Sequence, residues 1–492
     1  MRFTRIAALL ALSANVAFAQ GTPSTSATSS LTLDQAIQTA LRNNPQYLTT
    51  SNTVRTADAA VHSAYGGLLP TSNLNFSSAY RQGGSINVQG IQLAASGDQL
   101  QSSYNLGLNY NLSGASIFAP KQARSNLAAA QANVTGAAET LRSAVTQQYI
   151  ATLAAAASAA VDDSLVQTAQ AQLDLANAKM AVGAGTILDV RTAEVAVGNA
   201  KVLALTAHNT AEVAKLTLFQ DMGVPEQPGV QLTTTFAVQP LSFTLDSLLK
   251  LARRVNPQLA ASRSTANAAN MGVKMARTQY LPSLFMQTGW SGYAYQYTNS
   301  AFPVAQTQNQ FAQGLSSCLA SDSIRTRVGL SGLNCAQRFT FTPEMAEQIR
   351  ASNTAFPFSF TRQPLTLSAG LSIPVFNGFQ REQQVEQAEV NHDNADFAVR
   401  AQELQLNTSV TQAFLNVTTD VQTVALQEQN AQKAAEELTF AEEKYKVGTA
   451  TFLDVTTARG TYAQALSDRV NAIYTYHKDF AALESAVGRP LR

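Results

Sequence analysis

The chain has little charge for its length, and the charge it has is balanced. Of its 492 residues, 13% are Asp, Glu, Lys or Arg, and the formal net charge is +1. Soluble domains carry roughly 25% charged residues. A balanced charge gives no electrostatic basis for binding nucleic acid or a strongly acidic partner. Neutral polar residues replace the missing charges, which suits a surface that meets water through amides and hydroxyls.

Residues that bind metals are also scarce. The two cysteines, Cys318 and Cys335, lie 17 positions apart in a polar segment. In an exported protein they can remain thiols or form a disulfide, and we predict the disulfide. There are four histidines, and none has ligand spacing with another or with the cysteines: His62, His208, His392 and His477. No metal site is predicted.

Signatures of an enzyme are missing as well. The chain contains no Gly-rich phosphate loop, no Gly-x-Ser-x-Gly elbow and no paired His/Glu metal motif, and its carboxylates are isolated on Ala-rich segments. We predict no enzyme and no cofactor. Beyond the N-terminus no run of about 18 apolar residues occurs. The nearest, Tyr149 to Val161, is mostly Ala, so transmembrane helices are excluded.

The N-terminus has the features of a secretory signal. Arg2 and Arg5 precede an apolar run, and Ala17-Phe18-Ala19 forms a small-x-small cleavage site. We therefore predict a signal peptide over 1–19 and a flexible leader over 20–30, which is rich in Ser and Thr. No Cys follows the cleavage site, so a lipid anchor is not expected.

The rest of the chain is an internal duplication. Thr32-Leu33-Asp34, Asn44-Pro45 and Leu69-Pro70 recur 212 positions later as Thr244-Leu245-Asp246, Asn256-Pro257 and Leu281-Pro282. Later landmarks recur at an offset of 265, such as Gly183 with Gly448, so one insertion lies between Leu281 and Gly370 and contains both cysteines. We predict a first repeat over 31–225, a connecting segment over 226–242 and a second repeat over 243–492.

Each repeat is expected to contain helix, strand, strand, long helix, turn and helix. In the first repeat these elements are predicted over about 32–68, 72–80, 104–113, 120–181, 182–186 and 188–221. In the second they are predicted over about 244–281, 284–297, 364–376, 379–446, 447–451 and 452–487, with a long extracellular loop between the strands. Asn44-Pro45 is expected to split the first helix, and Leu-Pro ends the first helical pattern of each repeat.

The strands alternate apolar with Asn, Ser, Thr or Gly residues, a period that puts the apolar set on one face. In 284–297 the parity slips before Tyr293, which suggests a bulge. One such strand would suit a half-buried soluble sheet. Four, with aromatic ends in a secreted chain, favour an outer-membrane barrel wall.

Four strands cannot close a barrel, and an open sheet edge in lipid leaves backbone groups without partners. Other chains must therefore complete it. Two copies give about eight strands, whose interior side chains fill. Three copies give twelve strands and a lumen, so three is the preferred number.

The long helices carry a narrow seam. Leu127, Val134 and Leu141 repeat every seven residues, as in a coiled coil. Residues 120–181 would reach about 93 Å and 379–446 about 102 Å at 1.5 Å per residue. An ordinary coiled-coil bundle explains this seam equally well, but it does not explain the strands.

The two turns have matching sequences, 182–190 and 447–455. Gly183 and Gly448 suit the residue after a helix C-terminus. Thr186-x-x-Asp189 and Thr451-x-x-Asp454 suit capping boxes that open the next helix.

In this order the turns, the Asn-Pro and Leu-Pro pairs and the duplication resemble the TolC family of outer-membrane efflux and secretion channels. The most specific motifs are Tyr445-x-Val447-Gly448-Thr449 and the two Leu-Asp-Val sequences. The resemblance implies an α+β membrane protein: a homotrimer with a twelve-stranded outer-membrane barrel, continuous with a periplasmic α-helical coiled-coil barrel. It also implies docking of a membrane-fusion adaptor, which links the duct to an inner-membrane pump of the RND, ABC or MFS type.

By family position, the constriction residues would be Asp454, Thr457, Asp189 and Tyr445. The adaptor-docking residues would be Val182, Gly183, Gly185, Leu188, Val190, Val447, Gly448, Leu453 and Val455. Asp189 and Asp454 either cap their helices only or also line the entrance. Two positions depart from the family: Ala450 stands where Arg is frequent, and Thr457 where a second acidic residue is frequent. The way the entrance closes is left open.

The expected function is a passive trimeric duct that exports solutes or polypeptides through outer-membrane lipid. The alternative is a periplasmic coiled-coil scaffold or adaptor without a pore, which would stay soluble without detergent. The sequence names neither the cargo nor the pump, and it does not distinguish drug efflux from type I secretion.

Overall fold

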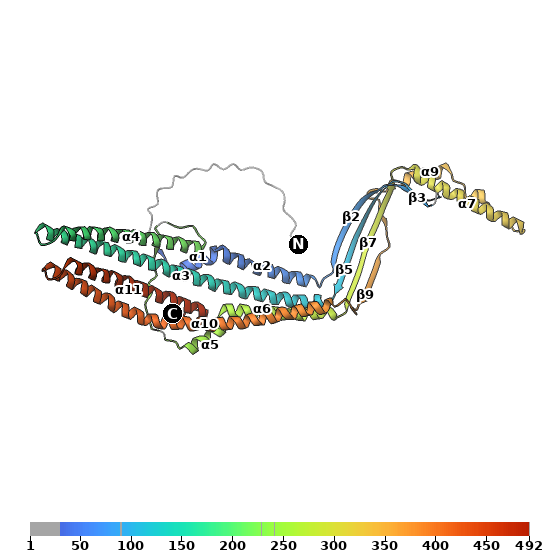
Figure 1. Cartoon of the computed structure of the whole chain (residues 1–492). Coiled ribbons are helices and arrows are strands. Elements are labelled where there is room, and N and C mark those ends of the chain that lie inside the picture. The colour runs from blue at the N-terminus through green and yellow to red at the C-terminus, as the bar shows by residue number, and fades with distance from the viewer. Residues whose placement is uncertain (1–29, 89–90, 228, 241, 492) are drawn as a thin grey trace. The chain divides into compact units, whose positions relative to one another are not determined.

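The structure, a computed structural model, describes residues 30–88, 91–227, 229–240 and 242–491. The predicted signal peptide and all but the last residue of the predicted leader lie outside these ranges. The chain divides into two compact units, which we call the helical unit (Met1–Thr56, Ala128–Ala266 and Ala395–Arg492) and the sheet unit (Ala57–Leu127 and Asn267–Asn394). Figure 1 shows the elements in chain order.

The helices occur in the same order in the two halves of the chain. Those of the first repeat are α1 (Leu33–Asn43), α2 (Pro45–Gly66), α3 (Gly114–Ala181) and α4 (Ile187–Met222). Those of the second are α5 (Leu245–Val255), α6 (Pro257–Arg277), α10 (Gln380–Lys446) and α11 (Phe452–Val487). Short strands β1 (Ser30–Leu31) and β6 (Gln231–Leu232) pair in parallel beside α1.

Some predicted bounds differ from these. The helix expected over 244–281 is two helices, because the residue before Pro257 avoids the helical region, and a 3-10 turn, Thr278–Tyr280, follows α6. The helix α3 begins six residues before the predicted start and carries Pro120 in its second turn. It is also long and apolar enough by composition to cross a membrane, whereas no transmembrane helix was predicted; much of its apolar character comes from alanine.

Within each repeat, an equivalent asparagine ties two helices together through the same pair of hydrogen bonds. The amide of Asn44 donates to the Asp221 carbonyl at 2.8 Å, and its oxygen accepts the Tyr47 N–H at 3.0 Å. Asn256 makes the equivalent bonds to Ala486 at 2.9 Å and Leu259 at 3.0 Å. Each asparagine thus caps one helix and ties it to the end of the last helix of its own repeat.

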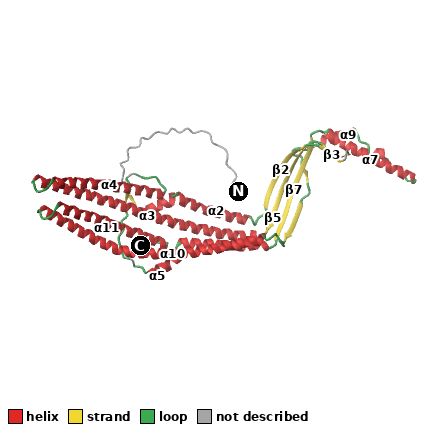
Figure 2. Cartoon of the chain, viewed as in Figure 1, coloured by secondary structure: helices red, strands yellow, loops and turns green. Residues whose placement is uncertain are grey.

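The sheet has four antiparallel positions, in the order β2 (Thr71–Arg81), β5 (Gln99–Leu112), β7 (Ser283–Tyr297) and then β9 (Thr366–Ser372) with β8 (Thr361–Arg362) (Figure 2). The strand predicted over about 104–113 is shorter than β5, which begins at Gln99. The fourth was predicted as one strand over 364–376. A further hairpin, β3 (Gly84–Val88) with β4 (Ile91–Ser96), was not predicted.

The predicted bulge in β7 is wrong. Its register with β5 is unbroken from Gln99↔Tyr297 to Leu112↔Leu284. The extra residue lies on the other side, between β8 and β9, because Gly289 pairs with Thr366 whereas Gly292 pairs with Arg362. The change of parity in the sequence therefore moves tyrosines to the opposite face of a regular strand.

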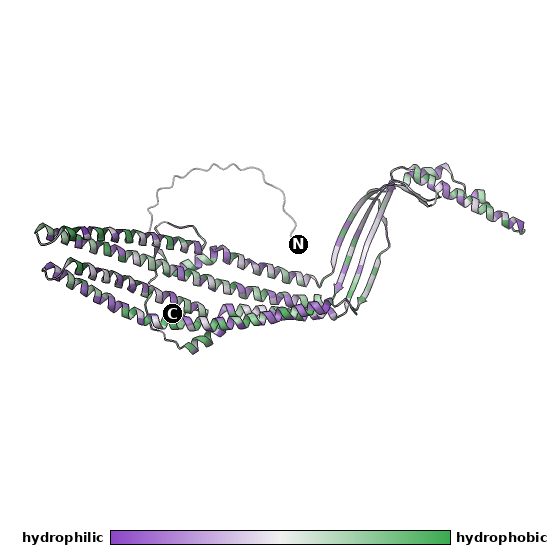
Figure 3. Ribbon diagram, in the orientation of Figure 1, coloured by the Kyte–Doolittle hydropathy of each residue, from purple (hydrophilic) through white to green (hydrophobic). Residues whose placement is uncertain are grey.

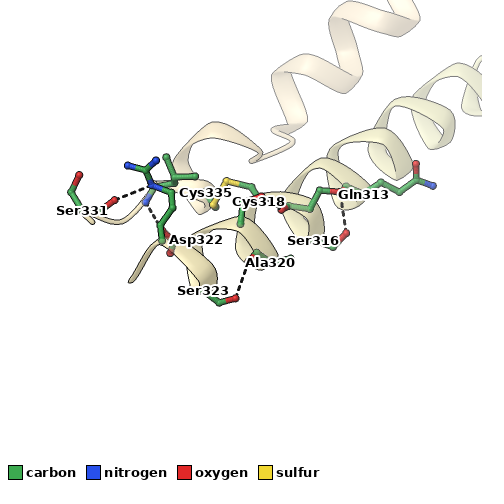
Figure 4. The surroundings of a disulfide bond; sticks show 12 residues. Gln313, Ser316, Cys318, Ala320, Asp322, Ser323, Ser331 and Cys335 are labelled. Carbon is green, nitrogen blue, oxygen red and sulfur yellow. Dashed lines mark hydrogen bonds between the residues drawn. A yellow bond between two sulfur atoms is a disulfide. The ribbon is translucent and has the colours of Figure 1, made fainter. Parts of the chain in front are cut away.

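The insertion in the second repeat, predicted as a long loop, is mostly helical. It contains α7 (Ala301–Arg327), α8 (Cys335–Arg338) and α9 (Pro343–Ser352). A disulfide joins Cys318 of α7 to Cys335 of α8 (Figure 4). Beside it, the Asp322 carboxylate accepts the Leu333 N–H. The disulfide and this bond hold the turn after α7 against the helix.

The contribution of these asparagine hydrogen bonds to stability can be tested by mutation. Asn256 is 7% exposed, and Asn256→Ala removes a helix cap and a buried hydrogen bond, so we expect a loss of about 1–3 kcal/mol. Thermal unfolding followed by circular dichroism would measure it. Asn52→Ala, at an exposed position of α2, is the control, and equal unfolding temperatures for the two variants would contradict the assignment.

Candidate functional site at the helix turns

Both turns lie in the helical unit and share one backbone geometry. Gly183 and Gly448 adopt φ angles of +75° and +82°, a region that side chains with a Cβ avoid. After them, Ala184 N–H donates to the Lys179 carbonyl at 2.8 Å, and Thr449 N–H donates to the Lys444 carbonyl at 2.9 Å. These bonds close the ends of α3 and α10 in the manner of a Schellman motif.

Capping boxes begin the next helices. The Asp189 carboxylate accepts the Thr186 N–H at 2.9 Å, and the Asp454 carboxylate accepts the Thr451 N–H at 2.7 Å. Asp454 also accepts the Thr451 hydroxyl at 2.8 Å. These hydrogen bonds, with the nearby Lys444, hold the pKa of Asp454 below its usual range. Both aspartates therefore act as caps, and Asp454 stays ionised under mildly acidic conditions.

Beneath the turns, the two hairpins of the chain meet in one apolar cluster. Its buried members come from α3, α4, α10 and α11: Ala176, Val190, Ala193, Leu438, Tyr445, Phe452, Val455 and Ala458. Tyr445 is 6% exposed, and its ring lies 5.7 Å from that of Phe452. Burial raises the pKa of the Tyr445 hydroxyl. This residue, assigned to the constriction by family position, lies between the hairpins within one chain.

Lys179 connects the two hairpins, and the sequence did not single it out. Its ammonium group lies 4.0 Å from the centre of the Tyr445 ring and donates a hydrogen bond to the Tyr445 carbonyl. The ammonium therefore satisfies a carbonyl at the C-terminal end of α10, where a cation is favoured. Its position in the last turn of α3 was the available signal.

The predicted docking residues fall into three groups. Four aliphatic side chains are exposed at equivalent places on the turns: Val182, Leu188, Val447 and Leu453, at 78%, 71%, 76% and 71%. By contrast, Val190 and Val455 are buried in the cluster, where they support the turns from inside. Gly183 and Gly448 have open space around them, whereas Gly185 lies against the backbone of Met180.

A groove runs beside α10 and α11 next to the second turn. Asp454 and Thr457 line it together with Ala450, Lys444 and Glu437. Thr457 is exposed, and its hydroxyl donates to the Leu453 carbonyl at 2.9 Å. No cluster of metal-ligating side chains occurs among the described residues. The groove can present neutral, acidic and basic side chains to a partner or a solute.

Comparison with known proteins agrees with this geometry. The "Outer membrane efflux protein" family matches residues 344–489. The chain is 23% identical to "Outer membrane protein TolC" of Escherichia coli (strain K12) over 321 residues, which cover 64% of this chain and 55% of that protein. The alignment thus spans about half the length of this relative.

Solved structures show the same fold over nearly the whole chain. CusC aligns with a TM-score of 0.70 at 16% identity, covering 93% of this chain and 92% of its own. VceC from Vibrio cholerae aligns with a TM-score of 0.66 at 17% identity, covering 94% and 97%.

Two helical hairpins with matched glycine turns and a four-stranded sheet are the fold that the chain shares with CusC and VceC. The chain is thus similar to the outer membrane efflux proteins over residues 344–489, and TolC is among its relatives. It is accordingly an outer-membrane protein that extends into the periplasm.

The Lys179 contact leads to a test in the folded protein. Lys179→Met keeps a good helix former but removes the cation–π contact and a hydrogen bond from a charged donor, so amides of residues 445–451 should exchange about fivefold faster or more. Hydrogen exchange read by mass spectrometry measures this. The control is Lys446→Met, at the exposed last residue of α10. Equal exchange in both variants would show that Lys179 does not join the hairpins.

Proposed function

We propose that the protein is a homotrimeric, passive export duct. The observation that carries the proposal is a single-layer sheet whose one face is apolar and exposed: Leu74, Phe76, Leu106, Leu108, Trp290 and Leu371. The edge strands β2 and β9 have no further strand partner among the described residues. An open edge in hydrocarbon leaves backbone groups without hydrogen bonds. Sister subunits that supply strands at both edges satisfy them, and three copies make twelve strands.

The helical unit has a matching unpaired surface. On α4, Val190, Val197 and Ala204 are buried at a spacing of seven. Two residues before each of these buried positions, Leu188, Val195 and Val202 are at least 61% exposed. Positions two apart point to nearly opposite sides of a helix, so α4 is apolar on two faces. One face packs within the chain, and the other is free for a neighbouring helix.

The helix α10 offers a suitable counterpart. Five large apolar side chains lie along one face of it, at spacings of 7, 11, 11 and 14 residues: Phe397, Leu404, Leu415, Leu426 and Phe440. These spacings are close to whole turns of a helix, so they form a nearly straight stripe. Pairing the α4 stripe of one subunit with the α10 stripe of the next would close a ring of helices around a lumen.

The exposed turns are the proposed docking surface for a periplasmic adaptor, through which an inner-membrane pump of the RND, ABC or MFS type would deliver cargo. Val182, Leu188, Val447 and Leu453 give the adaptor matching apolar contacts on both hairpins, and Gly183 and Gly448 set the shape of the turns. Either tripartite efflux or type I secretion is compatible with this arrangement, because the duct itself does not select the cargo.

At the entrance, we propose that Asp454 contributes three carboxylates around the threefold axis, with Thr457 beside it and Asp189 acting mainly as a cap. Ala450 cannot supply the basic group frequent in the family. The Lys179–Tyr445 contact holds the hairpins together within each subunit instead.

The alternative, a soluble scaffold, is separated from the duct by the position of the single tryptophan. Trp290 is 53% exposed on the apolar face, so in vesicles its fluorescence should be quenched by lipids with brominated acyl chains and not by aqueous iodide. The control is Trp290→Phe with Asn105→Trp, which moves the probe to the polar face and should reverse the pattern. Quenching of Trp290 by iodide alone would reject the barrel wall.

The role of Asp454 is tested by changing its charge while keeping the cap. In Asp454→Asn the amide oxygen can still accept the Thr451 N–H, so the turn should persist, while cation preference in planar-bilayer conductance should fall at least about twofold. Because the pKa of Asp454 is lowered, the wild-type preference is present at neutral pH and is lost only as the pH falls below the usual range of aspartate. Asp189→Asn is the matched control, with a smaller effect. Unchanged selectivity in Asp454→Asn would remove it from the entrance.

A further inference from the structure

Three tyrosines break the pattern of the sheet. On β7 the residues that share the polar face are Phe285, Gln287, Gly289, Ser291, Tyr293, Tyr295 and Tyr297, because the register with β5 continues without a shift. The apolar face at the same level holds Gly292 and Ala294, both buried. The tyrosines therefore do not belong to the lipid-facing set. They stand on the face that is otherwise lined mainly by Asn, Gln, Ser and Thr, with Phe285 near the opposite end of β7.

Two of these rings are open to solvent. Tyr293 is 38% exposed and Tyr295 is 49% exposed. Their rings stack, with centroids 6.2 Å apart and an interplanar angle of 16°. Tyr297 has a structural role instead, since its ring lies 5.2 Å from Phe302 at the start of α7. Tyr293 and Tyr295 form an exposed aromatic platform.

The surroundings of the platform are polar. Across the strand pair, Ser103 lies opposite Tyr293 and Gln101 lies opposite Tyr295, and Thr361 of β8 pairs with Tyr293 on the other side. None of these side chains carries a charge. They can exchange hydrogen bonds with the edge of a flat solute whose face lies on the rings.

The platform lies at the end of β7 that leads into α7, away from the end that follows α6 (Figure 1). Figure 3 shows purple and green alternating along these strands, as expected for a wall with two different faces. If the chain forms the proposed duct, the polar face lines the lumen. Each of the three subunits then contributes one platform near the outer mouth.

We propose that Tyr293 and Tyr295 form a binding site for uncharged solutes that carry a planar aromatic ring. The inference rests on the proposed duct for its place along the export path, but not for the binding itself. Ring stacking contributes about 2- to 10-fold in affinity per aromatic pair. Two rings without an enclosing pocket give weak, millimolar binding, which holds a ring-bearing solute at the mouth and still releases it.

The test uses the full-length protein in detergent, labelled with 3-fluorotyrosine. The 19F resonances of Tyr293 and Tyr295 are assigned by their loss in Tyr293→Phe and Tyr295→Phe. Nicotinamide, a neutral planar ring, should shift both resonances and saturate in the millimolar range. Cyclohexanecarboxamide, its saturated counterpart, should not. Equal shifts with both compounds, or none with nicotinamide, overturn the proposal. Tyr110, on the apolar face, should not respond to either.

A second measurement uses variants. Tyr293→Ser combined with Tyr295→Ser should weaken nicotinamide binding at least about fivefold, measured by saturation transfer to the nicotinamide protons, while Tyr110→Ser should leave it unchanged. Unchanged binding in the double variant overturns the site. These readouts need neither conductance nor trimers. Failure of the duct, shown by Trp290 quenching, is therefore distinguishable from failure of this site.

Discussion

The need to pair every backbone hydrogen-bonding group in hydrocarbon is the constraint on which the rest of the structure depends. The four-strand sheet satisfies its interior strands, β5 and β7, by itself. Its edges can be satisfied only by other strands, because in lipid neither water nor a loop can replace them. Once sister copies complete the sheet, the helices that leave it must also meet sister helices. The second apolar face of α4, marked by Leu188, Val195 and Val202, is what this requirement predicts.

Much of the fold could be predicted from the sequence, because the apolar residues of its strands recur regularly and the same Gly, Pro and helix-capping residues recur in both repeats. The capping boxes at Thr186 and Thr451 were predictable from local chemistry alone, and so was the break at Asn44-Pro45. The face of Tyr293 was not predicted correctly, because a change of parity in one strand has two explanations, a bulge or a change of face. Only the register with β5 distinguishes them. The fold of the insertion was missed for another reason: its helix α7 has one packed face and many exposed polar residues, which in sequence resembles a loop.

In the candidate site, too, some residues could be predicted from the sequence and others could not. Residues whose roles are set by neighbours in sequence, such as Gly183, Gly448 and the two aspartates, were found from the sequence. Residues whose roles depend on the contact between hairpins were not. Tyr445 and Lys179 lie 266 positions apart, and only the fold brings them together. Val190 and Val455, with the same spacing in both turns as the exposed Leu188 and Leu453, are buried because alternate positions of a short segment face opposite sides.

The contact between the hairpins would suit the opening of the proposed entrance. Of its eight buried members, three are alanines, and Tyr445 and Phe452 stand at the adjoining ends of α10 and α11. Lys179 adds a directional link, but it ends on a backbone carbonyl and a ring rather than on a carboxylate. Such a link involves no neutralised pair of charges and can be broken without leaving an uncompensated carboxylate in the cluster. The Asp189 and Asp454 carboxylates are bound to their own turns, so each turn can move as a rigid piece. Separation of the hairpins would then expose this cluster, while the two turns proposed to bind an adaptor keep their shape.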